Sequence, residues 1–363
     1  MLTPLLLLML KGANVSTTVA GLFAATSWLG ICVMTPFASV VTQKLGRRPA
    51  MWIASILPLL AAAGFLLTDS LPVWFVLELT AGVAGGLRWV LAEAFIAEFA
   101  PPGQTGRYIG AYATMVGITF VIGPTLLAWI GTDRSYALWG AIALLAIGLA
   151  WTVLIPKMPV EKDFHTAQLG LMGLLHAVAA HPVIMFAGFI GGFFELGLAS
   201  ILPLYGLELG LSAGAAALLV SVSGLGGTLA ALPAGTLADR FLSPRQGRRV
   251  MMVGFTTLIV LSTCATPFVG ERTGLLWPVV FIWGASGGAV YTLAMIDIGT
   301  SEQGITLVNS TAVLVLTYTL GGLVASASSG ALIQWSPTLG FPAFLLTAAC
   351  IGLATLIIGG KRC

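Results

Sequence analysis

The stretch "GTLADRFLSPRQGRR", Gly235 to Arg249, is a short charged segment between two long apolar runs. A second segment of this kind, "SVVTQKLGRR", Ser39 to Arg48, lies about half the chain earlier and ends in the same Gly-Arg-Arg. Sliding one half of the sequence over the other by 196 positions places Gly30 on Gly226, Ser39 on Gly235 and Gln43 on Asp239, while an inserted "LSPRQ"-like stretch shifts the Gly-Arg-Arg endings. The chain is therefore predicted to be an internal repeat, with one basic segment in each half.

Composition identifies a membrane protein. Hydrophobic residues make up 58% of the 363 residues, charged residues only 8%, and the mean hydropathy is +1.01, whereas soluble domains carry about a quarter charged residues. The net charge of +3 is small, and the basic residues are confined to a few gaps between apolar runs. Both features argue against nucleic acid as a partner. The spacing of the four cysteines supports neither a disulfide framework nor a metal site.

Apolar runs long enough to cross a bilayer, which needs about 20 residues per helix, set the expected number of spans. Eleven such runs are expected, at about 17–41, 50–68, 73–99, 108–130, 136–155, 183–207, 213–237, 250–269, 275–298, 305–334 and 339–359. The opening "MLTPLLLLML", residues 1–10, is too short to span and lacks the features of a signal peptide. We expect it to be the outer half of a first helix whose beginning is missing, with Lys11 at its end.

The distribution of Lys and Arg predicts the orientation, because cytoplasmic loops carry an excess of both. If the gap that holds Lys44, Arg47 and Arg48 is cytoplasmic, twelve of the 16 basic residues fall on that side. The other nine are Arg107, Lys157, Lys162, Arg240, Arg245, Arg248, Arg249, Lys361 and Arg362. The C-terminus is accordingly expected in the cytoplasm.

Three regions follow from the repeat: an N-terminal helical half at 1–155, a cytoplasmic linker at 156–182 and a C-terminal helical half at 183–363. The linker contains the longest polar stretch and is expected to include an amphipathic surface helix. Its histidines, His165, His176 and His181, are interpreted as residues of a solvated connector, and no metal site is expected.

The sequence resembles the major facilitator superfamily, because "GTLADRF…GRR" resembles the signature Gly-x-x-x-Asp-Arg-x-Gly-Arg-Arg of that superfamily, with "LSPRQ" inserted before the Gly-Arg-Arg. Further matching pieces are "PPGQTGRYIGAY" (101–112), Gly123-Pro124, "LPLYGLELGLS" (202–212) and "YTLAM" (291–295). Together they resemble the bacterial YcaD-like branch. The resemblance implies an all-α polytopic fold of two pseudo-symmetric six-helix halves, here with eleven full spans and an N-terminal half-helix.

The same resemblance implies a multi-pass transporter in the cell (inner) membrane, a monomer that moves a small organic solute such as a metabolite, sugar or drug. It implies alternating access, coupled to protons, with no cofactor and no enzymatic activity. A receptor or sensor of the same fold without net transport, and a truncated, impaired paralogue, remain the alternatives.

The two basic segments are expected to act as cytoplasmic latches that form contacts when that side closes. The residues assigned to them are Ser39, Gln43, Lys44, Gly46, Arg47, Arg48, Gly235, Asp239, Arg240, Gly247, Arg248 and Arg249. The first latch is expected to be weaker, because Gln43 replaces the acidic residue. Glu93, Glu98 and Arg107 are expected to complete the latch network. The alternative is that both segments only orient the chain in the membrane.

Ionisable residues within predicted spans mark a pathway or a partner, because burying them costs several kcal/mol. Arg88 and Glu195 come from opposite halves and are the candidate substrate and proton site, since carriers bind at the midplane between repeats. A purely structural role for the pair is the alternative. Glu78 is expected to snorkel from the outer end of its helix, and Asp297 to be solvated near the cytoplasmic surface.

Overall fold

The computed structural model describes residues 2–99, 105–131, 134–155, 175, 178–238, 244–268, 273–301 and 304–359, and within these ranges the regular structure is entirely helical. The elements are α1 (Leu2–Gly12), α2 (Thr17–Met34), η1 (Thr35–Phe37), α3 (Ala38–Leu45), α4 (Arg47–Leu67), α5 (Leu71–Phe99), α6 (Thr105–Ile130), α7 (Arg134–Thr152), α9 (Pro182–Gly192), η3 (Phe193–Gly197), α10 (Leu198–Glu208), α11 (Ala213–Ala238), α12 (Pro244–Cys264), η4 (Thr266–Phe268), η5 (Thr273–Leu275), α13 (Leu276–Ser301), α14 (Gly304–Trp335) and α15 (Gly340–Gly359).

The helix boundaries lie close to the predicted runs because caps and turn residues set them. Ser16 caps α2 by accepting a hydrogen bond from the Val19 backbone N–H at 3.3 Å. Gly46, with φ of +85°, separates α3 from α4. Within the described ranges, nine helical stretches are long and apolar enough to cross a membrane. The expected total of eleven spans stays a prediction.

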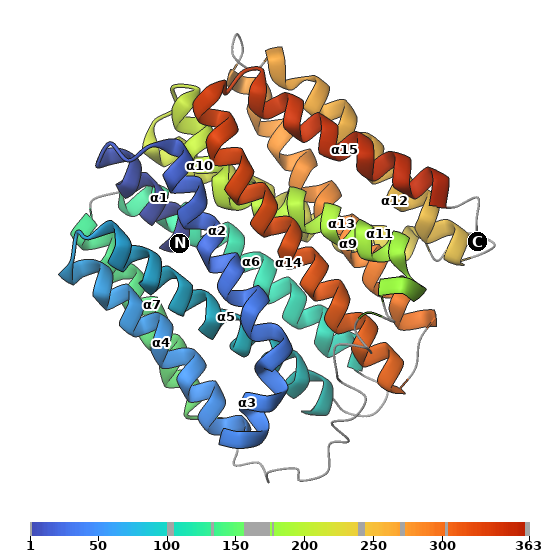
Figure 1. The fold of residues 1–363 in the computed structure, drawn as a ribbon, viewed down its shortest axis with the longest axis horizontal. Coiled ribbons are helices and arrows are strands. Elements are labelled where there is room, and N and C mark those ends of the chain that lie inside the picture. The colour runs from blue at the N-terminus through green and yellow to red at the C-terminus, as the bar shows by residue number, and fades with distance from the viewer. Residues whose placement is uncertain are drawn as a thin grey trace.

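The helices run alongside one another in one bundle (Figure 1). On one side α4 packs against α5 and α7, and on the other α12 packs against α13 and α15. Two long contacts join these groups: α2 lies beside α14, and α6 beside α11. Segments from before and after the predicted linker therefore meet along two helix pairs.

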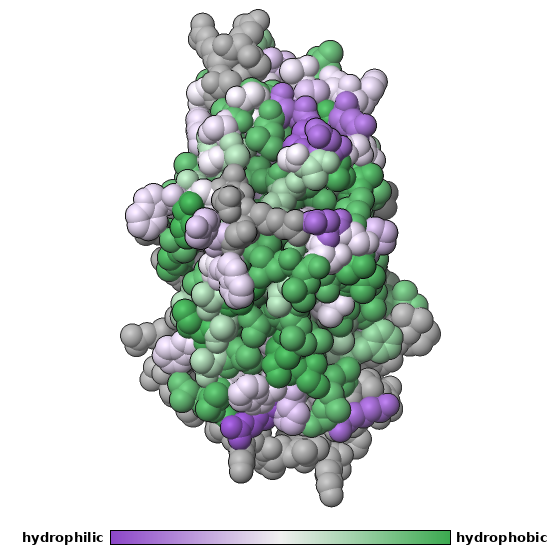
Figure 2. Space-filling model, turned by 90° about the vertical axis from the view of Figure 1, so that its left-hand side faces the viewer, coloured by the Kyte–Doolittle hydropathy of each residue, from purple (hydrophilic) through white to green (hydrophobic). Residues whose placement is uncertain are grey.

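The surface of the bundle carries many exposed apolar side chains, as expected for a protein in contact with lipid. Figure 2 shows a face covered largely by hydrophobic side chains, with hydrophilic ones gathered mainly toward its upper and lower ends. Large exposed apolar side chains such as Leu60, Trp139 and Ile147 are typical of lipid-facing positions.

The predicted repeat is visible in matching helix contacts. In α5, Gly82 lies directly against the Ser27 carbonyl of α2, and in α13, Gly284 lies directly against the Ser223 carbonyl of α11. Ser27 and Ser223 are 196 positions apart, the offset expected from the sequence. Both pairs need glycine because the backbones approach too closely to admit a Cβ.

The predicted linker lies outside the described residues, apart from 175 and 178–182. His165 and His176 fall in the part that is not described, and so does the expected surface helix. His181 stands directly before α9. Among the described residues, no cluster of His, Cys, Asp or Glu could hold a metal ion.

Candidate functional site

Glu195 lies where the helical run from Pro182 to Glu208 changes its geometry. Five residues, Phe193–Gly197, form a π-helical turn between α9 and α10. Such turns insert a residue into the helix and are frequent at functional sites. The Glu195 Oε2 atom accepts a hydrogen bond of 2.6 Å from the Tyr318 hydroxyl of α14. The carboxylate is thus fixed between helices rather than at a membrane surface.

Two glycines on neighbouring helices leave space for this carboxylate. A Cβ on Gly227 of α11 would lie 3.1 Å from Glu195 Oε1, and one on Gly288 of α13 would lie 3.0 Å from the same atom. Side chains at either position would crowd the carboxylate or force the helices apart. Gly227 and Gly288 therefore leave room for the Glu195 carboxylate as well as for close helix packing.

An aromatic group extends from Tyr318 to the other side of the bundle. The Tyr291 ring of α13 lies 4.0 Å from the Tyr318 ring, centroid to centroid. The Trp89 ring of α5 also meets Tyr318, edge-to-face at 6.5 Å. Glu195 is therefore connected through Tyr318 to a helix that precedes the predicted linker.

Arg88 precedes Trp89 in the chain and lies near the middle of α5, half-buried. It interacts electrostatically with Tyr112 of α6. Within the described part of the chain, neither an ion pair nor a hydrogen bond joins Arg88 to Glu195. The two candidate residues thus belong to one region but do not pair directly.

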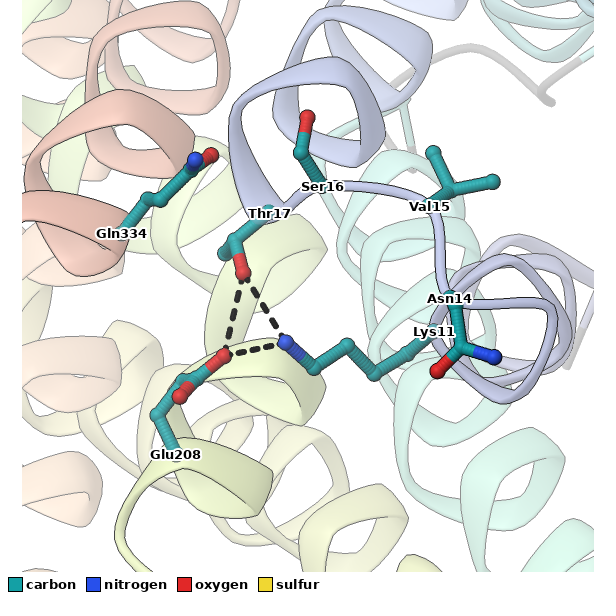
Figure 3. Close-up of a pocket in the computed structure, with 7 residues that line it drawn as sticks. All are labelled: Lys11, Asn14, Val15, Ser16, Thr17, Glu208 and Gln334. Carbon is teal, nitrogen blue, oxygen red and sulfur yellow. Dashed lines mark hydrogen bonds and ion pairs between the residues drawn. The ribbon is translucent and has the colours of Figure 1, made fainter.

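A second polar cluster joins residues of α1, α2, α10 and α14 (Figure 3). Lys11 Nζ of α1 forms an ion pair of 2.5 Å with Glu208 Oε1 of α10, and the Thr17 hydroxyl donates to the same oxygen at 3.0 Å. Nearby, Gln334 Oε1 of α14 accepts from the Thr18 backbone N–H at 2.9 Å. The cluster borders a cavity of about 330 Å³.

Comparison with known proteins decides what this bundle is. The family model "Major Facilitator Superfamily" matches residues 1–304. The chain belongs to the major facilitator superfamily. It is a multi-pass transporter of this superfamily, in agreement with the resemblance of its basic segments.

Relatives and solved structures agree with this assignment. The chain is 23% identical to the uncharacterized MFS-type transporter YfkF of Bacillus subtilis over 100% of this chain and 92% of that protein. It is 23% identical to YcaD of Escherichia coli over 92% and 84% of the two chains. Among solved structures, the D-xylose-proton symporter has a TM-score of 0.76 at 15% identity, over 94% and 86% of the chains. The nucleoside transporter NupG has 0.75 at 16%, over 98% and 93%.

The signature segment of the second half of this superfamily member holds a buried ion pair. Arg248 Nε of α12 lies 2.9 Å from Asp297 Oδ1 of α13, and both side chains are 7% exposed. The expectation that Asp297 is solvated is therefore wrong, because the end of α13 packs against α12 and turns the carboxylate toward the arginine. Gly247 is buried beside it. Asp239 and Arg240 lie outside the described residues, and of Gly235 only its place in α11 is described.

Backbone carbonyls bind the last arginine of each segment. Arg249 donates to the Leu356 carbonyl of α15 at 2.9 Å, and Arg48 approaches the Val153 carbonyl, next to α7, at 3.5 Å. Lys44 is exposed at the end of α3, and Arg47 begins α4. The side chains of Ser39, Gln43, Glu93, Glu98 and Arg107 are outside the described set, so their latch roles stay predictions.

Glu78 does not snorkel. Its side chain is 2% exposed and is hydrogen-bonded to Ser27 of α2. The expectation fails because α2 packs closely along α5 and covers this face of the helix. Glu78 therefore fixes a helix contact away from the lipid.

Sequence reasoning missed Tyr318, Trp89 and the contact between Lys11 and Glu208. One signal was available for Tyr318, because tyrosine is enriched at membrane interfaces, and a tyrosine in the interior of a span calls for a hydrogen-bond partner. The Lys11–Glu208 contact joins residues almost 200 positions apart, and no local pattern specifies it.

Proposed function

We propose that this transporter moves a small organic solute by alternating access, with residues 1–155 and 183–363 as the two moving halves and Glu195 as the proton-coupling residue. The observation that carries the proposal is the chain of contacts from Glu195 through Tyr318 to Trp89. It connects a titratable group of one half to a helix of the other.

Protonation of Glu195 would act on this contact directly. An ionised carboxylate deep in a bundle is costly unless it is hydrogen-bonded, and Tyr318 supplies that bond to Oε2. A protonated Glu195 no longer needs the hydroxyl, so Tyr318 becomes free to move relative to Trp89. Binding of a proton is thereby translated into a change at the boundary between the halves.

The Lys11 cluster supports the alternating-access part of the proposal. Lys11, Thr17 and Thr18 belong to the first half, whereas Glu208 and Gln334 belong to the second. Their contacts hold the two halves together at one end. By the positive-inside rule this end faces the outside, so we assign the structure to a state that is closed toward the outside.

Replacing the coupling residue tests the function. In Glu195→Gln, we expect a pH gradient no longer to drive accumulation, while exchange of solute across the membrane persists, because glutamine keeps the shape and loses the titration. The measurement is uptake into proteoliposomes of a solute first found by thermal-shift screening, beginning with solutes the size of the xylose and nucleosides named for the solved neighbours.

Asp69→Asn is the matched control, since it removes an exposed carboxylate between α4 and α5, away from the contacts described for Glu195 and for the Lys11 cluster. Accumulation that keeps its pH dependence in Glu195→Gln would contradict the coupling role. Solute binding without any uptake by the unaltered chain would favour the receptor alternative over a transporter mechanism.

Charge reversal tests the closed end. Lys11→Glu is expected to open this end, because the new carboxylate repels Glu208, and Lys11→Glu with Glu208→Lys is expected to close it again. The measurement is the labelling rate of Ser200→Cys by a membrane-impermeant maleimide, in a chain whose four cysteines are replaced by serine. Ser200 is buried where it accepts a hydrogen bond of 3.0 Å from Trp28 of α2. Equal labelling of all three proteins would contradict the closing role of the ion pair.

A further inference from the structure

We propose that Arg88 binds an anionic group of the transported solute, so that the substrates of this protein are organic anions bearing a carboxylate or a phosphate. The inference rests on the proposed transport function and deepens it by naming the substrate class. It starts from the surroundings of the guanidinium group.

Arg88 is a cation without a charge partner in the described structure. Ion pairs are formed there by Lys11 and Arg248, but Arg88 makes neither an ion pair nor a hydrogen bond with any described residue. Tyr112 interacts with it only electrostatically. An arginine near the middle of a membrane helix stays charged and is costly without a counter-ion or water.

Arg88 is less enclosed than the acidic residue on the same helix. The side chain is half-buried, whereas Glu78, ten residues earlier on the same helix, is 2% exposed and hydrogen-bonded. A guanidinium group offers two parallel N–H donors that match the two oxygens of a carboxylate or phosphate. An anionic solute therefore supplies a partner that the described residues do not.

Trp89, the residue after Arg88, places the proposed solute site next to Glu195. Trp89 contacts Tyr318, which donates to Glu195, so the solute site at Arg88 borders the proposed proton site. The half-buried Trp89 ring offers an apolar surface for the carbon part of a solute. Glu195 is in direct contact with Tyr318. While Glu195 is ionised, it would repel a second negative group of the solute near Tyr318.

Binding to the purified full-length protein tests the substrate class without any proton gradient. Probes of similar shape and different charge are compared: glucose, glucuronate, glucose 6-phosphate and glucosamine, then uridine and uridine 5′-monophosphate, then benzyl alcohol, benzoate and benzylamine. We expect stabilisation against heat by anionic members only. Glucuronate and benzoate report on carboxylates, and the two phosphate esters on phosphates.

The variants assign the effect to Arg88. In Arg88→Gln the affinity for the stabilising anion is expected to fall about tenfold or more, the usual loss when a charge-assisted hydrogen bond is removed. Arg88→Lys keeps the charge without the paired donors and is expected to bind with intermediate affinity. The melting temperature without ligand checks that each variant folds, and Arg88→Lys serves if Arg88→Gln does not.

Three outcomes would overturn the inference: stabilisation by neutral or cationic members as strong as by anions, no stabilisation by any anion, or anion binding unchanged in the Arg88 variants. Rescue of Arg88→Gln by an added Glu195→Gln would identify Glu195 as the counter-ion and would also overturn it. Failure of proton coupling is read separately, from Glu195→Gln in proteoliposomes, so the two proposals can fail independently.

Discussion

Asp297→Ala is expected to destabilise the protein by about 3 to 5 kcal/mol, the usual cost of removing one partner from a buried ion pair. Arg248 Nε and Asp297 Oδ1 are 2.9 Å apart with both side chains 7% exposed, so water screens the interaction little. The substitution leaves the guanidinium buried without this carboxylate. The measurement is denaturant-induced unfolding of the purified protein in detergent.

Two controls separate the buried pair from a general effect of charge. Glu208→Ala removes the carboxylate of a pair whose side chains are 34% and 27% exposed, so its loss is expected to cost only about 1 kcal/mol or less. Arg248→Met with Asp297→Leu replaces the buried pair by apolar residues and should recover much of the stability. A loss for Asp297→Ala no larger than for Glu208→Ala would show that this ion pair does not stabilise the fold.

Gly284→Ala is expected to have the second large effect, a loss of about 1 to 3 kcal/mol from overpacking. The added methyl group would overlap the Ser223 carbonyl of α11, and since that atom is backbone, the two helices must move apart. Gly82→Ala should behave alike, because Gly82 meets the Ser27 carbonyl in the equivalent contact. Unfolding in detergent again measures the change.

Gly254→Ala is the matched control, because Gly254 is also helical but a Cβ there meets nothing within 4 Å. Alanine is favoured over glycine in a helix by up to about 1 kcal/mol, so this substitution should be neutral or stabilising. Opposite signs for Gly284→Ala and Gly254→Ala would confirm that helix approach, and not helix propensity, governs Gly284. Equal effects would contradict the close contact.

The sequence by itself determined the helical segments, the repeat and the positions of the basic clusters. Hydropathy over about 20 residues reflects the thickness of the bilayer, and this local quantity predicted α4, at Arg47–Leu67, from the apolar run 50–68. The offset of 196 positions likewise predicted equivalent places for Ser27 and Ser223. Each of these properties can be read from consecutive residues or from a simple shift.

Only the tertiary structure decided which polar groups meet. Glu78 and Asp297 were assigned to accessible positions from their depth along a helix, yet both are buried by a neighbouring helix. Glu195 was recognised as important, but its partner Tyr318 lies 123 residues away. A membrane helix is apolar around most of its circumference, so its hydropathy fixes its length but not its rotation. Rotation and close packing at glycines determine whether a carboxylate meets lipid, a hydroxyl or an arginine, and they emerge only when the helices pack together.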